Sequence, residues 1–137
     1  MPSNTNKKAP SRKAPGSRLT ANIVSNPAPY IRPKAITNST DLQIVPFLFW
    51  LVSLKRPTTI TMLSVAEGVS YFACCQAVEH LSLDTRTYAV DPRDNSTLKT
   101  DSKSVSFNRL DEYNKAHYSE FSRFVQSSFS DAANHFS

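Results

Sequence analysis

The stretch TTITMLSVAEGVSYFACCQAVEHLSLDTRTYAVDP, residues 58–92, decides the fold. Residues 58–65 are dense in β-branched and apolar side chains and too short for a separate helix, so they predict a strand buried on both faces. Residues 70–81 follow a turn at Gly68 and predict a crossover helix whose packing face is made of small residues. Residues 85–90 predict a second strand. Because strands buried on both faces are usually parallel, the stretch predicts a βαβ unit.

A helix is expected before this unit. Asp41 is a plausible helix cap, Pro46 suits the first turn, and Lys55-Arg56-Pro57 is expected to end the helix. The apolar face of this helix is expected to contain Phe47, Leu48, Leu51, Val52 and Leu54.

The pattern continues after the second strand. Residues 93–106 are polar without periodicity and predict a loop, and residues 107–119 predict a helix. A short strand over 123–127 and a last helix over 131–136 are expected next. The sequence therefore predicts an α/β domain over residues 41–137, with one helix followed by the order β-α-β-α-β-α.

The first forty residues differ from the rest in composition. Residues 1–40 carry seven positive charges, no acidic residue and six of the nine prolines, whereas residues 41–137 carry nine positive and eleven negative charges. A segment with so few large apolar residues cannot bury enough surface to offset its chain entropy, so we expect a disordered basic tail. A solubilising arm explains the tail. Seven dispersed charges support nucleic-acid or anionic-membrane contact only weakly, so nucleic acid is an unlikely partner.

Targeting and membrane signals are weak. The first thirty residues contain no apolar core of a signal peptide. The longest apolar run, residues 44–54, is shorter than the roughly twenty residues that a membrane span needs. Cys74 and Cys75 are adjacent, which is neither a redox motif nor a metal-ligand spacing, and inert thiols of an intracellular protein are expected. The sequence predicts a cytoplasmic protein without a membrane span.

The βαβ unit carries one nucleotide-binding pattern. Gly68 lies in the turn after the first strand, and Asp91 ends the second strand 23 residues later. A glycine in this turn lets the backbone approach a ligand closely, and the acid accepts hydrogen bonds from ribose hydroxyls. On spacing alone, a turn glycine and a helix-capping aspartate explain the two residues equally well.

A family resemblance adds to this pattern. Residues 46–92, which contain PFLFWLVSLKRP, GVSYFACCQAV and YAVD, resemble the opening of a family of bacterial class I S-adenosylmethionine-dependent methyltransferases, often found alone or beside glycosyltransferase modules. Their "PFxFWLVExLRP" helix precedes a "VELGxxxGVSYxAFCQAV" segment and a "YAVD" strand. Residues 117–136 are similar to the third strand and helix of the family. The resemblance covers about 70 of the 137 residues.

The resemblance implies a cofactor and its contacts. It implies that S-adenosylmethionine is the cofactor, that Gly68 lies at the cofactor loop and that Asp91 meets the ribose. It also implies that Ser127 or the following Ser128 lies near the adenine. Ser64 belongs to the same cofactor loop, where the family usually has glycine, and its Cβ stands where the backbone approaches the ligand.

Other features of the family's first motif are changed or absent. Met62 stands where the family usually has an acidic residue. Ser70 and Tyr71 would open the helix beneath the loop. The family continues with further strands beyond the segment that ends here at Ser137, so we expect an incomplete Rossmann-like parallel sheet of three strands with flanking helices. The first strand, central in the family, would then be an exposed edge that invites pairing with a completing protein partner or a second copy.

The remaining candidate residues have simpler explanations. The histidines lie in different elements without metal-ligand spacing, so no metal site is expected: His80, His117 and His135. A solvated helix face explains the acidic residues Asp111, Glu112 and Glu120. Core packing explains the aromatic residues that base stacking would otherwise suggest: Tyr113, Tyr118, Phe121 and Phe124.

Three functions remain open. The first is an S-adenosylmethionine-dependent methyltransferase, truncated or degenerate, whose acceptor and catalytic residues the sequence does not identify. The alternative is a non-catalytic fragment or interaction module with a basic tail, which Met62 and Ser64 favour. The third is a nucleic-acid binder that acts through its tail, and nothing in residues 41–137 supports it.

Overall fold

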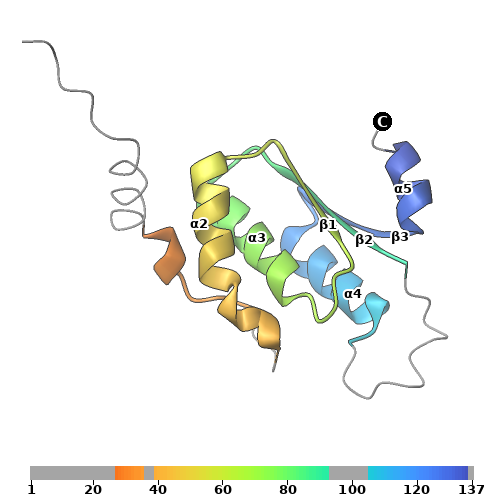
Figure 1. Ribbon diagram of the computed structural model, residues 1–137, viewed down its shortest axis with the longest axis horizontal. Helices are drawn as coiled ribbons and strands as arrows, with labels where there is room; N and C mark the ends of the chain where they lie inside the picture. The colour runs from red at the N-terminus through yellow and green to blue at the C-terminus, as the bar shows by residue number, and fades with distance from the viewer. Residues whose placement is uncertain (1–26, 36–38, 93–104, 136–137) are drawn as a thin grey trace, which may run out of the picture.

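The chain alternates helices and strands in the predicted order (Figure 1). The computed structural model describes residues 27–35, 39–92 and 105–135. Its elements are the 3-10 helices η1 (Ala28–Tyr30) and η2 (Thr40–Gln43), the helices α2 (Val45–Lys55), α3 (Val69–His80), α4 (Phe107–Tyr118) and α5 (Phe129–His135), and the strands β1 (Thr59–Leu63), β2 (Arg86–Asp91) and β3 (Ser122–Gln126). Each helix and strand predicted after residue 41 is confirmed, with ends that differ by a few residues. The predicted loop lies mostly outside the described residues.

The three strands form one parallel sheet. β2 is central, and β1 and β3 pair with it on either side. The register places Leu63 beside Val90, and Asp91 beside Gln126. The carboxyl ends of all three strands therefore lie at one edge of the sheet. The predicted fold class is confirmed as an α/β, partial Rossmann-like arrangement with one open three-stranded sheet and flanking helices.

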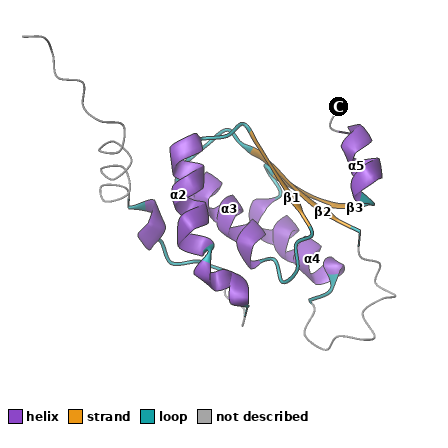
Figure 2. Cartoon of the chain, in the orientation of Figure 1, coloured by secondary structure: helices purple, strands orange, loops and turns teal. Residues whose placement is uncertain are grey.

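The helices cover the two faces of the sheet unequally. α2, α3 and α4 lie on one face, and α5 lies on the other side of the sheet near the end of β3 (Figure 2). Side chains from α2 and α3 pack with Ile60 and Met62 of β1. Side chains from α3 and α4 pack with Ala89 of β2 and Phe124 of β3. The core of the described part of the chain therefore lies between the sheet and these three helices.

β1 is buried on one face only, which corrects the prediction of a strand buried on both. Ile60 and Met62 face the helices, while Thr59, Thr61 and Leu63 are exposed. Leu63 has 56% of its surface exposed. The reason is that α5, the described helix on the other side of the sheet, has its main strand contacts with β2. The β-branched composition of the strand could not reveal that one face lacks a cover.

The buried face of α2 agrees with the predicted one at Leu48 and Val52 but differs from it at Phe47. Val45, Phe49 and Val52 are buried, whereas Phe47 is 49% exposed. Nearly every residue of this helix is apolar, so the sequence carries no period from which to choose a face. The helix ends as predicted, with Arg56 in the left-handed conformation. Despite its apolar character, neither α2 nor any other described helix has the length and hydrophobicity to cross a membrane.

Residues 27–35, called the N-terminal segment below, pack on the domain. Ala28 is buried in the core formed with α2 and α3. The folded part therefore begins before the predicted boundary at residue 41, while residues 1–26 lie outside the described part of the chain. Asp41 does not cap α2 as predicted: it lies in η2, and Ile44 occupies the cap position of α2. The cap of η2 is Ser39, whose hydroxyl accepts a hydrogen bond from the Asp41 amide.

Candidate functional site

Three of the predicted cofactor residues meet at the carboxyl edge of the sheet. Ser64 follows β1, Asp91 ends β2, and Ser127 follows β3. The Ser64 amide donates to the Val90 carbonyl at 2.9 Å, and the Ser127 amide donates to the Asp91 carbonyl at 3.3 Å. Parallel strand order thus brings together residues that are far apart in the sequence.

The Asp91 side chain holds the loop that follows β1. Its Oδ2 accepts a hydrogen bond from the Val65 amide at 3.2 Å. The residue has no exposed surface. A buried carboxylate needs hydrogen-bond donors, and here a main-chain amide of the neighbouring strand's loop supplies one. In this conformation Asp91 is bonded to the protein backbone, and its carboxylate is closed to solvent.

The loop over residues 64–68 has an alternating left-handed backbone. Ser64, Ala66 and Gly68 have φ angles of 62°, 46° and 84°. This conformation costs residues with a Cβ about 1–2 kcal/mol, and only glycine adopts it freely. The loop therefore has, at Ser64 and Ala66, a geometry that suits glycine. The Ser64 backbone is thus left-handed in spite of its side chain.

Gly68 is required for packing as well as for its backbone angle. A Cβ added at this position would lie 2.8 Å from Cδ2 of Leu110 and 2.8 Å from Cε2 of Phe72. Gly68 thus lets α4 and α3 approach each other at the start of α3. This contact gives a structural reason for the glycine, separate from the predicted approach to a ligand.

The first residues of α3 bond to groups other than those at the carboxyl edge of the sheet. The Ser70 hydroxyl donates to Oδ2 of Asp41 at 3.0 Å, which ties the start of α3 to η2. Tyr71 is buried beneath the helix. Its hydroxyl donates to Thr87 at 3.1 Å and lies 2.6 Å from the Ser122 hydroxyl. Burial raises the Tyr71 pKa, and a nearby charge on Cys75 would raise it further.

Sequence reasoning missed the buried polar network around Tyr71. Ser122 donates to the Asn114 side chain, and the Asn114 amide donates to the Ser122 carbonyl at 3.4 Å. The network links α3, α4, β2 and β3 beneath the sheet. The hydroxyl and amide side chains of this network follow no sequence spacing that would have predicted their contact.

The two cysteines are free and buried on α3. Burial is the largest effect on both, and it raises the pKa of Cys74 to about 12 and that of Cys75 to about 11. Since the thiolate is the reactive form, both groups are poor nucleophiles near neutral pH. Within the described residues, no cluster of three or more His, Cys, Asp or Glu side chains is arranged to hold a metal ion.

A pocket of about 440 Å³ lies beside the loop over residues 64–68 rather than over the strand ends. Its polar lining includes Lys34, Arg109, Glu67 and Glu112, and its apolar lining includes Phe72 and Leu110. Of the loop over residues 64–68, only Glu67 is among the described lining residues. The pocket therefore lies between the N-terminal segment, α3 and α4. Its lining includes Phe72 and Leu110, which pack against Gly68, but none of Ser64, Asp91 and Ser127.

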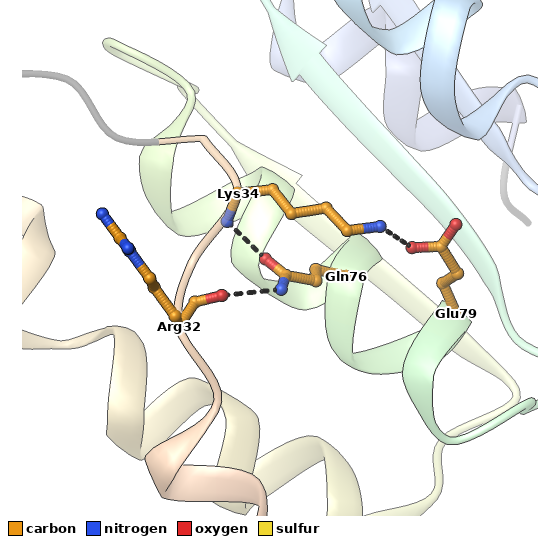
Figure 3. A network of polar contacts seen from close by, with 4 residues as sticks. All are labelled: Arg32, Lys34, Gln76 and Glu79. Carbon is orange, nitrogen blue, oxygen red and sulfur yellow. Dashed lines mark hydrogen bonds and ion pairs between the residues drawn. The ribbon is translucent and has the colours of Figure 1, made fainter.

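The N-terminal segment lines this pocket with Lys34 and Ala35, and Gln76 of α3 binds the segment. Figure 3 shows the Gln76 side chain between the main chain of Arg32 and that of Lys34. The Lys34 amide donates to Oε1 at 2.8 Å, and Nε2 donates to the Arg32 carbonyl at 2.9 Å. The Lys34 ammonium also contacts the Glu79 carboxylate at 2.7 Å. Gln76 thus satisfies both of its polar atoms with main-chain groups, as a neighbouring strand would.

Comparison with protein-family models, with curated proteins and with solved structures finds no match for this chain. The methyltransferase resemblance therefore stays a prediction.

Proposed function

We propose that this chain is an S-adenosylmethionine-binding unit of methyltransferase type, with an acceptor still to be identified. One observation carries the proposal: the parallel strands bring Ser64, Asp91 and Ser127 together at the carboxyl edge of the sheet. In open parallel sheets, ligands bind outside the carboxyl ends of the strands, and an acid after the second strand suits a ribose. Fold alone does not define function, so the site residues carry the argument.

The residue types at this edge suit S-adenosylmethionine, but the Asp91 carboxylate can bind it only after a local conformational change. The left-handed loop places main-chain groups at the carboxyl edge of the sheet, and Ser64 is exposed there. Asp91 has no exposed surface, so a ribose can reach its carboxylate only if the contact with Val65 opens. Bound S-adenosylmethionine would supply a methyl group on a positively charged sulfur. The part proposed for this chain is to bind and orient that cofactor.

Calorimetric titration with S-adenosylmethionine tests the proposal. We expect saturable binding to the purified chain, weakened at least about tenfold by Asp91→Asn, a loss of about 1.4 kcal/mol. Asp84→Asn is the matched control, because Asp84 is an exposed carboxylate just before Thr85 and β2, at the opposite edge of the sheet. It is expected to bind like the wild-type chain.

A second variant tests the cofactor site without changing Asp91, whose substitution could unfold the protein. Ser127→Leu adds bulk at the end of β3, where Ser127 is half-buried. It is expected to weaken binding while the circular dichroism spectrum stays unchanged. If the folded wild-type chain gives no heat of binding, or if Asp84→Asn and Asp91→Asn weaken binding equally, the proposed cofactor site is refuted.

The non-catalytic interaction module is the second candidate. The observation that favours it is the open edge of β1, which pairs with β2 on one side only within the described residues. It predicts self-association or partner binding without affinity for S-adenosylmethionine. The same titration, combined with a measurement of molar mass, separates the two candidates.

A further inference from the structure

The free edge of β1 exposes main-chain hydrogen-bonding groups. Thr58 accepts from Arg86, and Ser64 donates to Val90, so the even-numbered residues of this stretch face β2. Alternate residues of a strand direct their N–H and C=O groups to opposite edges. Thr59, Thr61 and Leu63 therefore direct these groups away from the sheet. In the described part of the chain, no other strand pairs with this edge.

This edge also lacks the features that usually prevent pairing. Natural edge strands are often protected by charged side chains, proline or a bulge. β1 contains only threonine, isoleucine, methionine and leucine, and its ladder with β2 runs without interruption from Thr59 to Leu63. Its side chains on the uncovered face are exposed, with Leu63 the largest.

We propose that two copies of this chain pair through β1, antiparallel about a two-fold axis at Thr61. This register places Thr61 opposite its own copy and Thr59 opposite Leu63 of the second copy. In this symmetric register all three outward-facing residues form hydrogen-bonded pairs. If the axis were one residue nearer the start of the strand, Leu63 would lie opposite Pro57, which has no N–H to donate. Each such pair exchanges two hydrogen bonds.

The two ends of β1 complement each other in this arrangement. The chain enters the strand through Lys55 and Arg56, both exposed, and continues after it toward Glu67. Antiparallel pairing sets the basic end of one strand beside the acidic end of the other. Opposite charges there favour this orientation, whereas a parallel pairing would set like charges together. On the helix-covered face, Ile60 would lie opposite Met62 of the second copy, which continues the apolar layer under the joined sheet.

Charge substitutions at the axis give the first test. Multi-angle light scattering of the full chain is expected to show a dimer that dissociates on dilution. Because the Thr61 side chain is exposed, Thr61→Lys is expected to keep the fold and to weaken dimerisation at least tenfold through like charges on the axis. Thr61→Glu is expected to do the same. An equimolar mixture of the two variants is expected to restore the dimer.

Disulfide trapping gives the second test and fixes the register. Hydrogen-bonded antiparallel pairs have Cα atoms about 5.5 Å apart, which a disulfide can bridge. Thr61→Cys is therefore expected to cross-link two chains in a glutathione redox buffer. Leu63→Cys is the matched control: it is equally exposed, but its copy lies about 14 Å away, four residues along the partner strand.

The light-scattering and cross-linking results can each support or overturn the proposed dimer. A monomeric wild-type chain at all concentrations overturns it, as does a dimer that Thr61→Lys leaves unchanged. Equal cross-linking of the two cysteine variants refutes this register. The proposal does not depend on S-adenosylmethionine binding, so failure of the titration above leaves it intact.

Discussion

The Val65 amide donates to the carboxylate of Asp91 across the space between the first two strands, at 3.2 Å. Replacing Asp91 by alanine leaves that buried amide without this acceptor. Hydrogen bonds to charged groups contribute about 1.5–3 kcal/mol, so the free energy of unfolding is expected to fall by about this amount. Urea denaturation of Asp91→Ala measures it. The exposed Asp84→Ala is expected to change stability by less than about 0.5 kcal/mol, and an equal effect of both would contradict this role of Asp91.

The loop geometry predicts opposite effects for two small substitutions. Gly68→Ala forces a Cβ against Leu110 and Phe72 at a left-handed position, and is expected to lower the free energy of unfolding by more than about 1 kcal/mol. Ala66→Gly removes left-handed strain at an exposed position and is expected to raise it by up to about 1 kcal/mol. Thermal denaturation compares both. Loss of stability in Ala66→Gly would show that the loop carries no strain there.

Gln76 is predicted to hold the N-terminal segment in place. Gln76→Leu keeps the volume of the buried side chain but leaves the Lys34 amide and the Arg32 carbonyl without their partner. We expect faster tryptic cleavage after Lys34 and a loss of about 1–3 kcal/mol in stability. Glu79→Gln removes the exposed ion pair to Lys34 and serves as the control, with an effect below about 1 kcal/mol. Equal protease resistance of Gln76→Leu and the wild-type chain would refute the prediction.

Alkaline pH is predicted to destabilise the protein through its buried thiols. Burial raises the pKa of Cys74 from 9.0 to about 12 and that of Cys75 from 9.0 to about 11. The unfolded chain loses these protons near pH 9, while the folded chain keeps them, so stability falls as pH rises from about 9 through the folded-state values. The expected loss is up to about 1.4 kcal/mol per pH unit for each thiol.

Urea denaturation between pH 8 and pH 11 tests this dependence. Tyr71 adds to the loss at the alkaline end, because burial raises its pKa as well. Cys74→Ala is expected to flatten the profile. A profile of the same slope in that variant would show that this thiol ionises alike in the folded and unfolded chains.

Local pattern was enough to predict most of the fold. The β-branched run of β1, the turn at Gly68 and the acid at Asp91 predicted a βαβ unit, and the parallel pairing of β1 with β2 confirms it. The prediction that Phe47 lies on the packed face of α2 was wrong, and Phe49 is buried instead, because a helix that is apolar all round has no period. The prediction that β1 is buried on both faces was wrong, because burial depends on the positions of neighbouring helices, which the sequence of the strand does not define.

The candidate site was predictable in position but not in contacts. The spacing of Gly68 and Asp91 indicated residues at the carboxyl edge of the sheet, where Ser64 and Ser127 also lie. It did not reveal that Asp91 bonds the Val65 amide, because a side chain's partner depends on a register that only the folded sheet defines. Nor did it reveal Gln76, whose partners lie in a proline-rich segment more than forty positions away.

The bonding of Gln76 has a consequence for how this chain can vary. The Gln76 side-chain amide forms these hydrogen bonds with main-chain atoms of Arg32 and Lys34. Pro33, which lies between them, has no N–H that needs an acceptor. Substitutions at positions 32 and 34 therefore leave these two hydrogen bonds possible, whereas a change at position 76 removes both at once. This part of the docking, unlike the packing of Ala28 and the ion pair of Lys34 with Glu79, therefore depends on the residue at position 76 and not on the side chains at positions 32 and 34.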